Sequence, residues 1–263
     1  MKFRSFVFLC CITPFLVGVC LGSNQKREGD FADSINKTLA IGNAVWLESG
    51  GTKFLGLYTQ TEKVTSKGAV IILHDRDGHP NQQQLIYGLR VFLPGHDWAT
   101  LSLQMPLREA GAGDEDYYAL FAEASARVKA GIDYAKSNGA ENIVVVGYGL
   151  GGLMGLYALS EQAADIKALV AISLPVPKTE NKVAQTLELL KQVKIPMLDI
   201  YGALDVSDVT GSARDRRVSA KENTGYRQIK INDEGHAYLH DEGLLVKRIY
   251  SWLGVAFDTA SAE

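Results

Sequence analysis

The sequence predicts a single α/β domain with a doubly wound, mostly parallel sheet and helices on both faces. Short apolar runs, such as 69–73 and 143–146, alternate with longer stretches in which apolar residues recur every three or four positions. Uninterrupted apolar runs are typical of parallel strands that are buried on both faces. A chain of 263 residues, 46% of them hydrophobic, is large enough to bury one core of this kind.

The predicted elements alternate in this way from residue 43 onward. The β-type runs 44–47 and 54–58 flank a turn-prone Ser-Gly-Gly segment, which predicts an opening hairpin. The strands predicted after it are 69–73, 99–104, 143–146, 168–173, 197–201 and 227–231. The predicted helices are 82–93, 115–137, 152–163, 181–192 and 244–253. The chain divides into a linker or surface segment (23–42), the domain (43–257) and a frayed tail (258–263).

Residues 1–22 are predicted to be a signal peptide. Lys2 and Arg4 precede the apolar run 6–21, and the small residues Gly22 and Ser23 follow it. We therefore expect cleavage near Gly22 and a periplasmic or secreted location. An uncleaved anchor is an alternative, but the run is short and interrupted for a membrane span of ~20 residues. Lipidation of a cysteine in the run is a further alternative.

Composition restricts the partners and the chemistry of the mature chain. All the cysteines lie in the predicted leader, at positions 10, 11 and 20, so we expect no disulfide and no cysteine nucleophile. The formal charge of −3 argues against non-specific binding to nucleic acid or to anionic membranes. No later segment is long and apolar enough to cross a bilayer. We also expect no cofactor.

The segment Gly147-Tyr148-Gly149-Leu150-Gly151 follows a buried strand and opens a helix. It matches the G-x-S-x-G nucleophile elbow at each position except the serine, which Gly149 replaces. Glycine tolerates the positive φ of such a turn but offers no nucleophile. A generic glycine-rich turn is the alternative interpretation. The dinucleotide fingerprint fits less well, because its spacing differs and it usually follows the first strand.

Two polar residues follow later strands, where a catalytic acid and a catalytic histidine are expected. Asp205 follows the strand 197–201, and His236 follows the last predicted strand. Hydrolases with this kind of elbow carry the nucleophile, the acid and the histidine in that chain order. Asp208 is an alternative acid, and Asp233 is a weaker one. The two leading candidates are therefore Asp205 and His236.

On these residues the chain resembles the α/β-hydrolase superfamily from about residue 43 to residue 253. It is especially similar to an exported bacterial branch in which a motif like Gly-Trp-x-Thr-Leu-Ser-x-Gln-x-Pro follows the first long helix. The corresponding motif here lies within residues 95–106. The resemblance implies the α/β-hydrolase fold. It implies no particular activity, and it leaves Asp205 and His236 as a vestigial pair or as a general-base pair.

Groups around Gly149 predict a binding site. The N–H groups of Leu150 and Gly151 at the predicted helix start form a site that suits a carboxylate or a polarised carbonyl, which would then meet His236. In the loop after strand 69–73, Arg76 offers a charge-assisted contact to an anionic ligand. The predicted binding residues are Gly149, Leu150, Gly151, His74, Asp75 and Arg76.

Two other interpretations of polar residues are disfavoured. The loop 74–79 contains two histidines and two aspartates, which suit zinc or manganese, but adjacent residues rarely point at one centre, so we predict no metal. Ser102 and Ser173, at predicted strand ends, are candidates for a displaced nucleophile. A flat strand end supplies neither a base nor an oxyanion hole.

Three functions are compatible with this sequence. The first is non-hydrolytic binding of a small molecule or an envelope protein in the cleft over Gly149. The second is an esterase-like or other hydrolase in which His236 and Asp205 activate water or a substrate hydroxyl directly. The third is an interaction role in the cell envelope. The fold alone does not choose among them.

Overall fold

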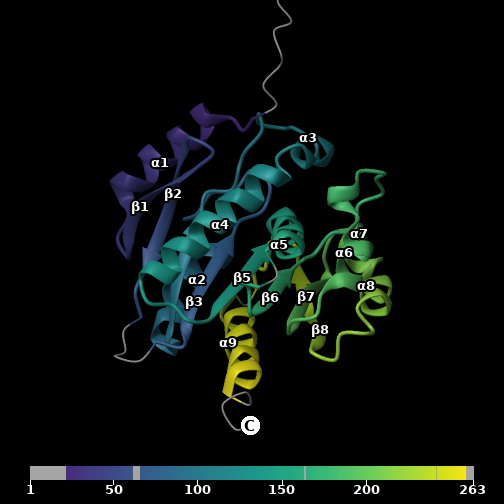
Figure 1. Cartoon of the computed structure of the whole chain (residues 1–263). Coiled ribbons are helices and arrows are strands. Elements are labelled where there is room, and N and C mark those ends of the chain that lie inside the picture. Colours follow the sequence, from purple (N-terminus) through teal and green to yellow (C-terminus); the bar gives the residue numbers. More distant parts are fainter. Residues whose placement is uncertain (1–21, 62–65, 163, 241, 259–263) are drawn as a thin grey trace, which may run out of the picture.

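Eight strands form one sheet in the order β1-β2-β4-β3-β5-β6-β7-β8 (Figure 1). The structure is a computed structural model that describes residues 22–61, 66–162, 164–240 and 242–258. Strand β2 is antiparallel to both β1 and β4, and the remaining neighbours are parallel. The predicted α/β fold with a mostly parallel sheet is confirmed.

The elements have the following bounds. The strands are β1 (Asn43–Ser49), β2 (Thr52–Thr59), β3 (Gly68–Leu73), β4 (Trp98–Leu103), β5 (Ile143–Tyr148), β6 (Ala168–Ile172), β7 (Met197–Leu204) and β8 (Tyr226–Gly235). The α-helices are α1 (Gln25–Thr38), α2 (Leu85–Phe92), α3 (Asp114–Tyr118), α4 (Phe121–Ser137), α5 (Leu150–Glu161), α6 (Thr186–Gln192), α7 (Ser207–Thr210), α8 (Ala213–Ser219) and α9 (Glu242–Asp258). The short 3-10 helices are η1 (Leu93–His96) and η2 (Lys182–Ala184).

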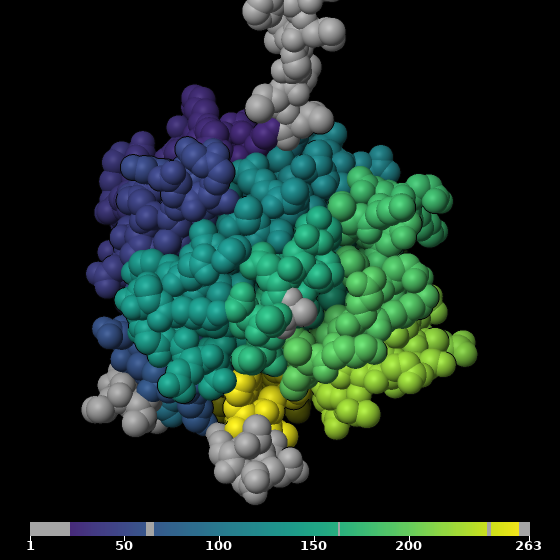
Figure 2. All heavy atoms as spheres, in the orientation of Figure 1, coloured from purple at the N-terminus to yellow at the C-terminus, as the bar shows by residue number. Residues whose placement is uncertain are grey.

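Helices cover both faces of the sheet, as the continuous apolar strands predict. One face packs against α4, α5 and α6, and the other packs against α2 and α9. The face turned toward the reader in Figure 2 is covered by the atoms of α4 and α5, and the C-terminal helix lies below them. Helix α1 packs separately on Leu55 and Leu57 of β2.

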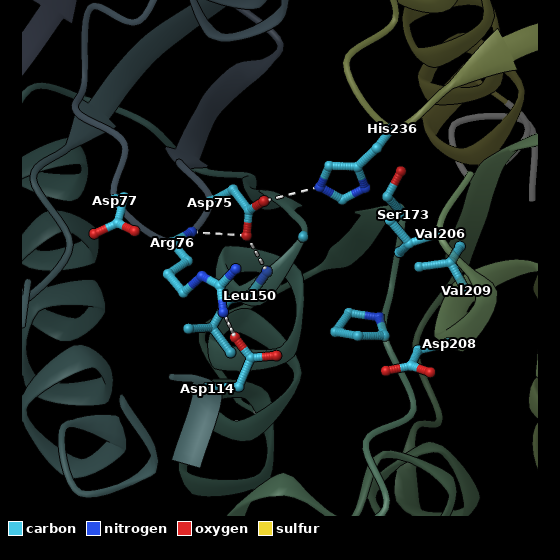
Figure 3. Close-up of a pocket in the computed structure, with 12 residues that line it drawn as sticks. Asp75, Arg76, Asp77, Asp114, Leu150, Ser173, Val206, Asp208, Val209 and His236 are labelled. Carbon is cyan, nitrogen blue, oxygen red and sulfur yellow. Dashed lines mark hydrogen bonds and ion pairs between the residues drawn. The ribbon is translucent and has the colours of Figure 1, made fainter. Parts of the chain in front are cut away.

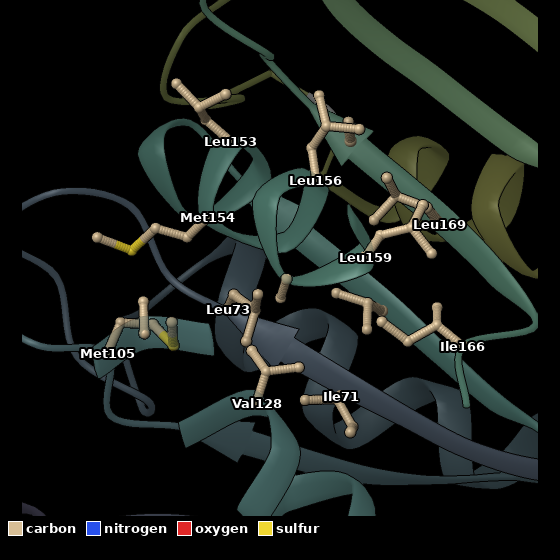
Figure 4. Close-up of a cluster of buried hydrophobic side chains, with 14 of the residues drawn as sticks. Ile71, Leu73, Met105, Val128, Leu153, Met154, Leu156, Leu159, Ile166 and Leu169 are labelled. Carbon is tan, nitrogen blue, oxygen red and sulfur yellow. The ribbon is translucent and has the colours of Figure 1, made fainter. Parts of the chain in front are cut away.

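Strand β3 illustrates how the core is divided. Ile71 and Leu73 point to the α4–α5 side, and Val70 and Ile72 point to the α2–α9 side. All four are fully buried, because successive side chains of a strand alternate between two covered faces. Figure 4 shows the α4–α5 side, where Ile71 and Leu73 lie among the aliphatic side chains of these helices.

The structure divides two of the predicted helices and adds two short ones. The stretch predicted as one helix from 181 to 192 is the 3-10 helix η2 followed by α6, with Gln185 between them. The stretch predicted as one helix from 115 to 137 is two helices, α3 and α4, that meet at Leu120. The side chains of Tyr117, Tyr118, Leu120 and Phe121 are all buried, so packing against the core decides this break rather than a glycine or proline. The short helices α7 and α8 were not predicted, because four to seven residues are too few to show a clear period.

Two predictions concern the termini. The predicted signal peptide lies outside the described residues except for Gly22, and so do the three cysteines. The predicted tail 258–263 lies outside them except for Asp258. Within the part of the chain that is described, no helix has the length and apolarity to span a membrane.

Candidate functional site

The carboxyl ends of the parallel strands meet at one edge of the sheet, and the candidate residues lie there. Gly149 forms the sharp turn between β5 and α5, with φ 55° and ψ −123°. A side chain at Gly151 would overlap the carbonyl oxygens of Leu73 and His74, so this turn lies directly against the loop after β3. Glycine is required here because two backbones touch.

The Asp75 carboxylate occupies the space above Gly149. A Cβ atom placed on Gly149 would overlap the carboxylate carbon and both oxygens of Asp75. Asp75 Oδ1 accepts hydrogen bonds from the backbone N–H of Leu150 (2.6 Å) and from that of Arg76 (2.7 Å). In hydrolases with a serine elbow, the N–H after the nucleophile and one from the loop after β3 bind the oxyanion. Asp75 therefore fills the places of both the serine side chain and the oxyanion.

His236 lies between two carboxylates. Its Nε2 is 2.9 Å from Asp75 Oδ2, and its Nδ1 is 2.7 Å from Asp205 Oδ1 (Figure 3 shows the Asp75 contact). Burial alone would lower the pKa of His236, but hydrogen bonds and charge from Asp205 and Asp75 raise it to about 9. The imidazole is therefore protonated at neutral pH and donates a hydrogen bond to each carboxylate.

Asp205 is the acid that contacts the histidine, in agreement with its predicted position. Its side chain is buried, and it accepts hydrogen bonds from Ser173 Oγ (2.5 Å) and from the backbone N–H of Val206 (2.8 Å). The Ser173 hydroxyl also contacts the Tyr238 hydroxyl at 2.9 Å. Burial would raise the pKa of Asp205, but the hydrogen bonds from His236 and Ser173 hold it below its ordinary value. The Asp205 carboxylate is thus held rigidly behind His236.

A cavity of about 270 Å³ opens beside the Asp75–His236 pair. In Figure 3, Asp75, Arg76, Asp114 and Leu150 lie on one side of it, and Ser173, Val206, Val209 and Asp208 lie on the other. Pro175 also lines it, so its apolar lining comes from leucine, proline and two valines. Four carboxylates and two cations, Arg76 and His236, make its charged lining negative overall.

Two of the predicted binding residues have other roles in the structure. His74 is buried under the loop and does not line this cavity. Its Nε2 accepts the backbone N–H of Met105 (2.9 Å), and burial lowers its pKa to about 4, so it is a neutral structural residue. Arg76 lines the cavity, but its guanidinium forms an ion pair with Asp114. The predicted anion site at the helix start is already occupied by Asp75.

Of the weaker candidates, Ser102 and Asp233 lie outside the Asp75–His236–Asp205 group, and Ser173 contacts it through Asp205. Ser102 is buried within β4 and does not line the cavity, and Asp233 is exposed. Ser173 does line the cavity, with an unusual φ of 53°, but its hydroxyl is bonded to Asp205 and Tyr238. Among the described residues, no three His, Cys, Asp or Glu side chains are grouped so that they could hold a metal ion.

Sheet order, elbow geometry and the acid–histidine pair together define a protein of the α/β-hydrolase fold with glycine at the turn of the elbow. A model of the family described as "Protein of unknown function (DUF3530)" matches residues 20–124 and 114–254, and the chain belongs to that family. A comparison with curated proteins finds no match.

Solved structures of esterases and hydrolases share the fold. Est1E from Butyrivibrio proteoclasticus is 18% identical, with a TM-score of 0.66, over 81% of this chain and 98% of that one. The Pyrococcus furiosus esterase Pf2001 is 18% identical, with a TM-score of 0.65, over 83% and 98%. An alpha-beta serine hydrolase homologue from Coxiella burnetii is 14% identical, with a TM-score of 0.64, over 81% and 98%. At these identities the likeness establishes the fold alone.

The sequence identified the loop that carries Asp75 but not the position of its carboxylate. One signal could have suggested the position of this carboxylate. Asp75 comes two residues after β3, and β3 is the neighbour of β5, which leads into a turn that has glycine in place of serine. The pairing of Arg76 with Asp114, and the contact of Ser173 with Asp205, join residues 38 and 32 positions apart. No local pattern indicates either contact.

Proposed function

We propose that this protein is a non-hydrolytic member of the α/β-hydrolase fold that binds a small, positively charged molecule in the cavity beside Asp75 and His236. The observation that carries the proposal is the Asp75 carboxylate, which lies where a serine nucleophile would be and accepts the two N–H groups that would bind an oxyanion. A substrate carbonyl has no free oxyanion site in this arrangement.

The state of His236 supports the same conclusion. A general base must accept a proton, and a histidine with a pKa of about 9 already carries it at neutral pH. The alternative in which His236 and Asp205 activate water therefore requires Asp75 to move away first. In the present arrangement, Asp75, His236 and Asp205 form a hydrogen-bonded carboxylate–imidazolium–carboxylate chain.

The size and the lining of the cavity support a small, positively charged ligand. Its volume of about 270 Å³ is near the lower end for small-molecule sites, which favours a compact ligand. Apolar walls from Leu150, Pro175 and Val209 suit an aliphatic or aromatic body, and the excess of carboxylates favours a cationic group. The exposed Asp208 lies on the side opposite Arg76 and is placed to meet that group (Figure 3).

A ligand panel tests the proposal. The protein is titrated with small amines and quaternary ammonium compounds and with matched carboxylates, and the unfolding midpoint is followed. A cationic ligand at a hundred times its Kd stabilises by about 2.7 kcal/mol, which raises the midpoint of a domain of this size by roughly 5–10 °C. Asp208→Asn should weaken the response, whereas Asp33→Asn, on the surface of α1, changes the net charge equally and should not.

Turnover of short p-nitrophenyl esters is measured on the same samples. We expect no rate above that of His236→Ala. Ester hydrolysis that disappears in His236→Ala would overturn the non-hydrolytic assignment. A response to carboxylates and not to amines would overturn the ligand class.

A further inference from the structure

The first described residues lie against α4, which is 100 positions further along the chain at their point of contact. The backbone N of Ser23 is 3.3 Å from Glu123 Oε2, and Ser23 Oγ donates to Glu123 Oε1 at 2.7 Å. The next residue, Asn24, donates its N–H to the carbonyl of Leu107 at 2.7 Å, and its side chain caps α1. The backbone nitrogen of residue 23 is therefore held in a defined place beside a carboxylate.

That carboxylate belongs to a buried cluster whose charges do not balance. Arg127 is 1% exposed and forms ion pairs with Glu28 (2.9 Å) and Glu123 (2.5 Å). Among the described residues it is the only cation in an ion pair with either glutamate. Two carboxylates face one guanidinium, and an unmatched charge in a mostly buried cluster is costly. Burial, opposed by Arg127 and reinforced by the charge of Glu123, raises the pKa of Glu28.

We propose that the chain is cleaved between Gly22 and Ser23, and that the new α-ammonium group of Ser23 supplies the missing positive charge to the cluster of Glu28, Glu123 and Arg127. A peptidase adds water across this peptide bond, so that Gly22 leaves as a carboxylate and the Ser23 amine takes up a proton. The ammonium forms at the atom that already faces Glu123. Among the hydrogen bonds between described residues, cleavage removes the one from Arg108 to the exposed Gly22 carbonyl.

The sequence supports this bond as the site of cleavage. Cys20 and Gly22 place small side chains three residues and one residue before it, after the apolar run that two cations precede. The structure adds the reason why the position matters. A terminus one residue longer or shorter would move the ammonium away from Glu123, because consecutive Cα atoms are about 3.8 Å apart.

The cluster is connected to the candidate site. Arg127 donates to the carbonyl of Gln104 (2.8 Å), and the Gln104 side chain contacts His74 Nε2 (3.0 Å). His74 in turn bonds the carbonyl of Asp75 through Nδ1 (2.8 Å). In the same segment, Arg27 of α1 pairs with Asp77 at 2.5 Å. Through these hydrogen bonds, the cleaved N-terminus stabilises the loop that carries Asp75.

The experiment first determines the terminus. The full chain is exported in a bacterial host, and intact mass and N-terminal sequencing identify the first residue. We expect Ser23. A mature chain that begins elsewhere, or that keeps residues 1–22, would overturn the proposal.

A thermodynamic cycle then tests the ammonium. The chain that begins at Ser23 is compared with the same chain acetylated at its N-terminus, each with and without Glu123→Gln. Acetylation should lower the unfolding midpoint by about 2–4 °C, the effect of roughly 1 kcal/mol in a domain of this size. Glu123→Gln should abolish this difference, and Glu161→Gln, on the exposed end of α5, should preserve it. A difference that survives Glu123→Gln would show that the charge acts elsewhere and would refute the assignment.

Discussion

The charge state of His236 depends on Asp75, and Asp75→Asn tests this dependence with little change in shape. The asparagine oxygen keeps the two backbone N–H bonds of Leu150 and Arg76, while the negative charge 2.9 Å from Nε2 disappears. Removal of an opposite charge at this distance lowers a histidine pKa by about 1–3. The pKa of His236 should therefore fall from about 9 to between about 6 and 8.

The same shift sets a pH dependence of stability. The pKa of His236 is raised on folding, so its stabilising contribution is complete below pH 6.5 and is lost as the pH rises toward 9. The difference between 6.5 and about 9 corresponds to about 3 kcal/mol. Solvent screening at a side chain that is 32% exposed reduces this to about 1–2 kcal/mol. In Asp75→Asn the loss over this pH range should be smaller, because less of the shift above 6.5 remains.

Proton and nitrogen NMR titration of the imidazole signals measures the pKa directly, and His236→Ala assigns the signal. Asp208→Asn is the matched control, because it removes a carboxylate from the same cavity without touching His236. Urea unfolding at pH 6.5 and pH 9 measures the change in stability. A wild-type pKa near 6.5, or a value near 9 that persists in Asp75→Asn, would refute the reasoning.

Three further predictions follow from the packing. Gly149→Ser alone should show no esterase activity because the new side chain overlaps Asp75, whereas Gly149→Ser with Asp75→Ala should hydrolyse p-nitrophenyl esters. Adding His236→Ala should remove that rate, and equal rates with and without Asp75 would contradict the steric argument. Arg216→Met should cost about 3–5 kcal/mol in urea unfolding, because it leaves the buried Asp199 carboxylate without its cation; a loss below 1 kcal/mol would contradict this. Gly151→Ala should cost about 1–3 kcal/mol by calorimetry, because its Cβ meets backbone, whereas the Gly155→Ala Cβ meets only side chains and should cost less.

The fold and the acid–histidine pair could be predicted because their signals are local. The buried strands are short runs such as Ile143–Val146, and the turn at Gly149 lies between the second and third predicted helices, in the expected order. Asp205 comes directly after β7 and His236 directly after β8, and parallel strands bring their carboxyl ends to one edge. Their 2.7 Å contact follows from that topology.

The helix in the N-terminal segment does not follow from its own sequence, because distant contacts stabilise it. The helix α1 has few apolar residues, so its sequence alone is also compatible with a linker. In the structure, Glu28 accepts the N–H of Leu107 and pairs with Arg127, about 80 and 100 positions away. Helical propensity alone does not decide whether a short polar segment folds.

By itself, the sequence determined the α/β architecture, the alternation of its main strands and helices and the glycine at position 149, because each depends on periodicity or on the ends of strands. It favoured Asp205 as the partner of His236 but kept Asp208 and Asp233 as alternatives, and the 2.7 Å contact selects Asp205. Only the tertiary structure decided that the Asp75 carboxylate occupies the space that a side chain at position 149 would take. That result depends on the close contact between the loop after β3 and the start of α5, which brings a carboxylate within 2.6 Å of a backbone N–H 75 residues away. This contact depends on how the two backbones pack against each other, and the residue pattern of neither segment predicts that packing.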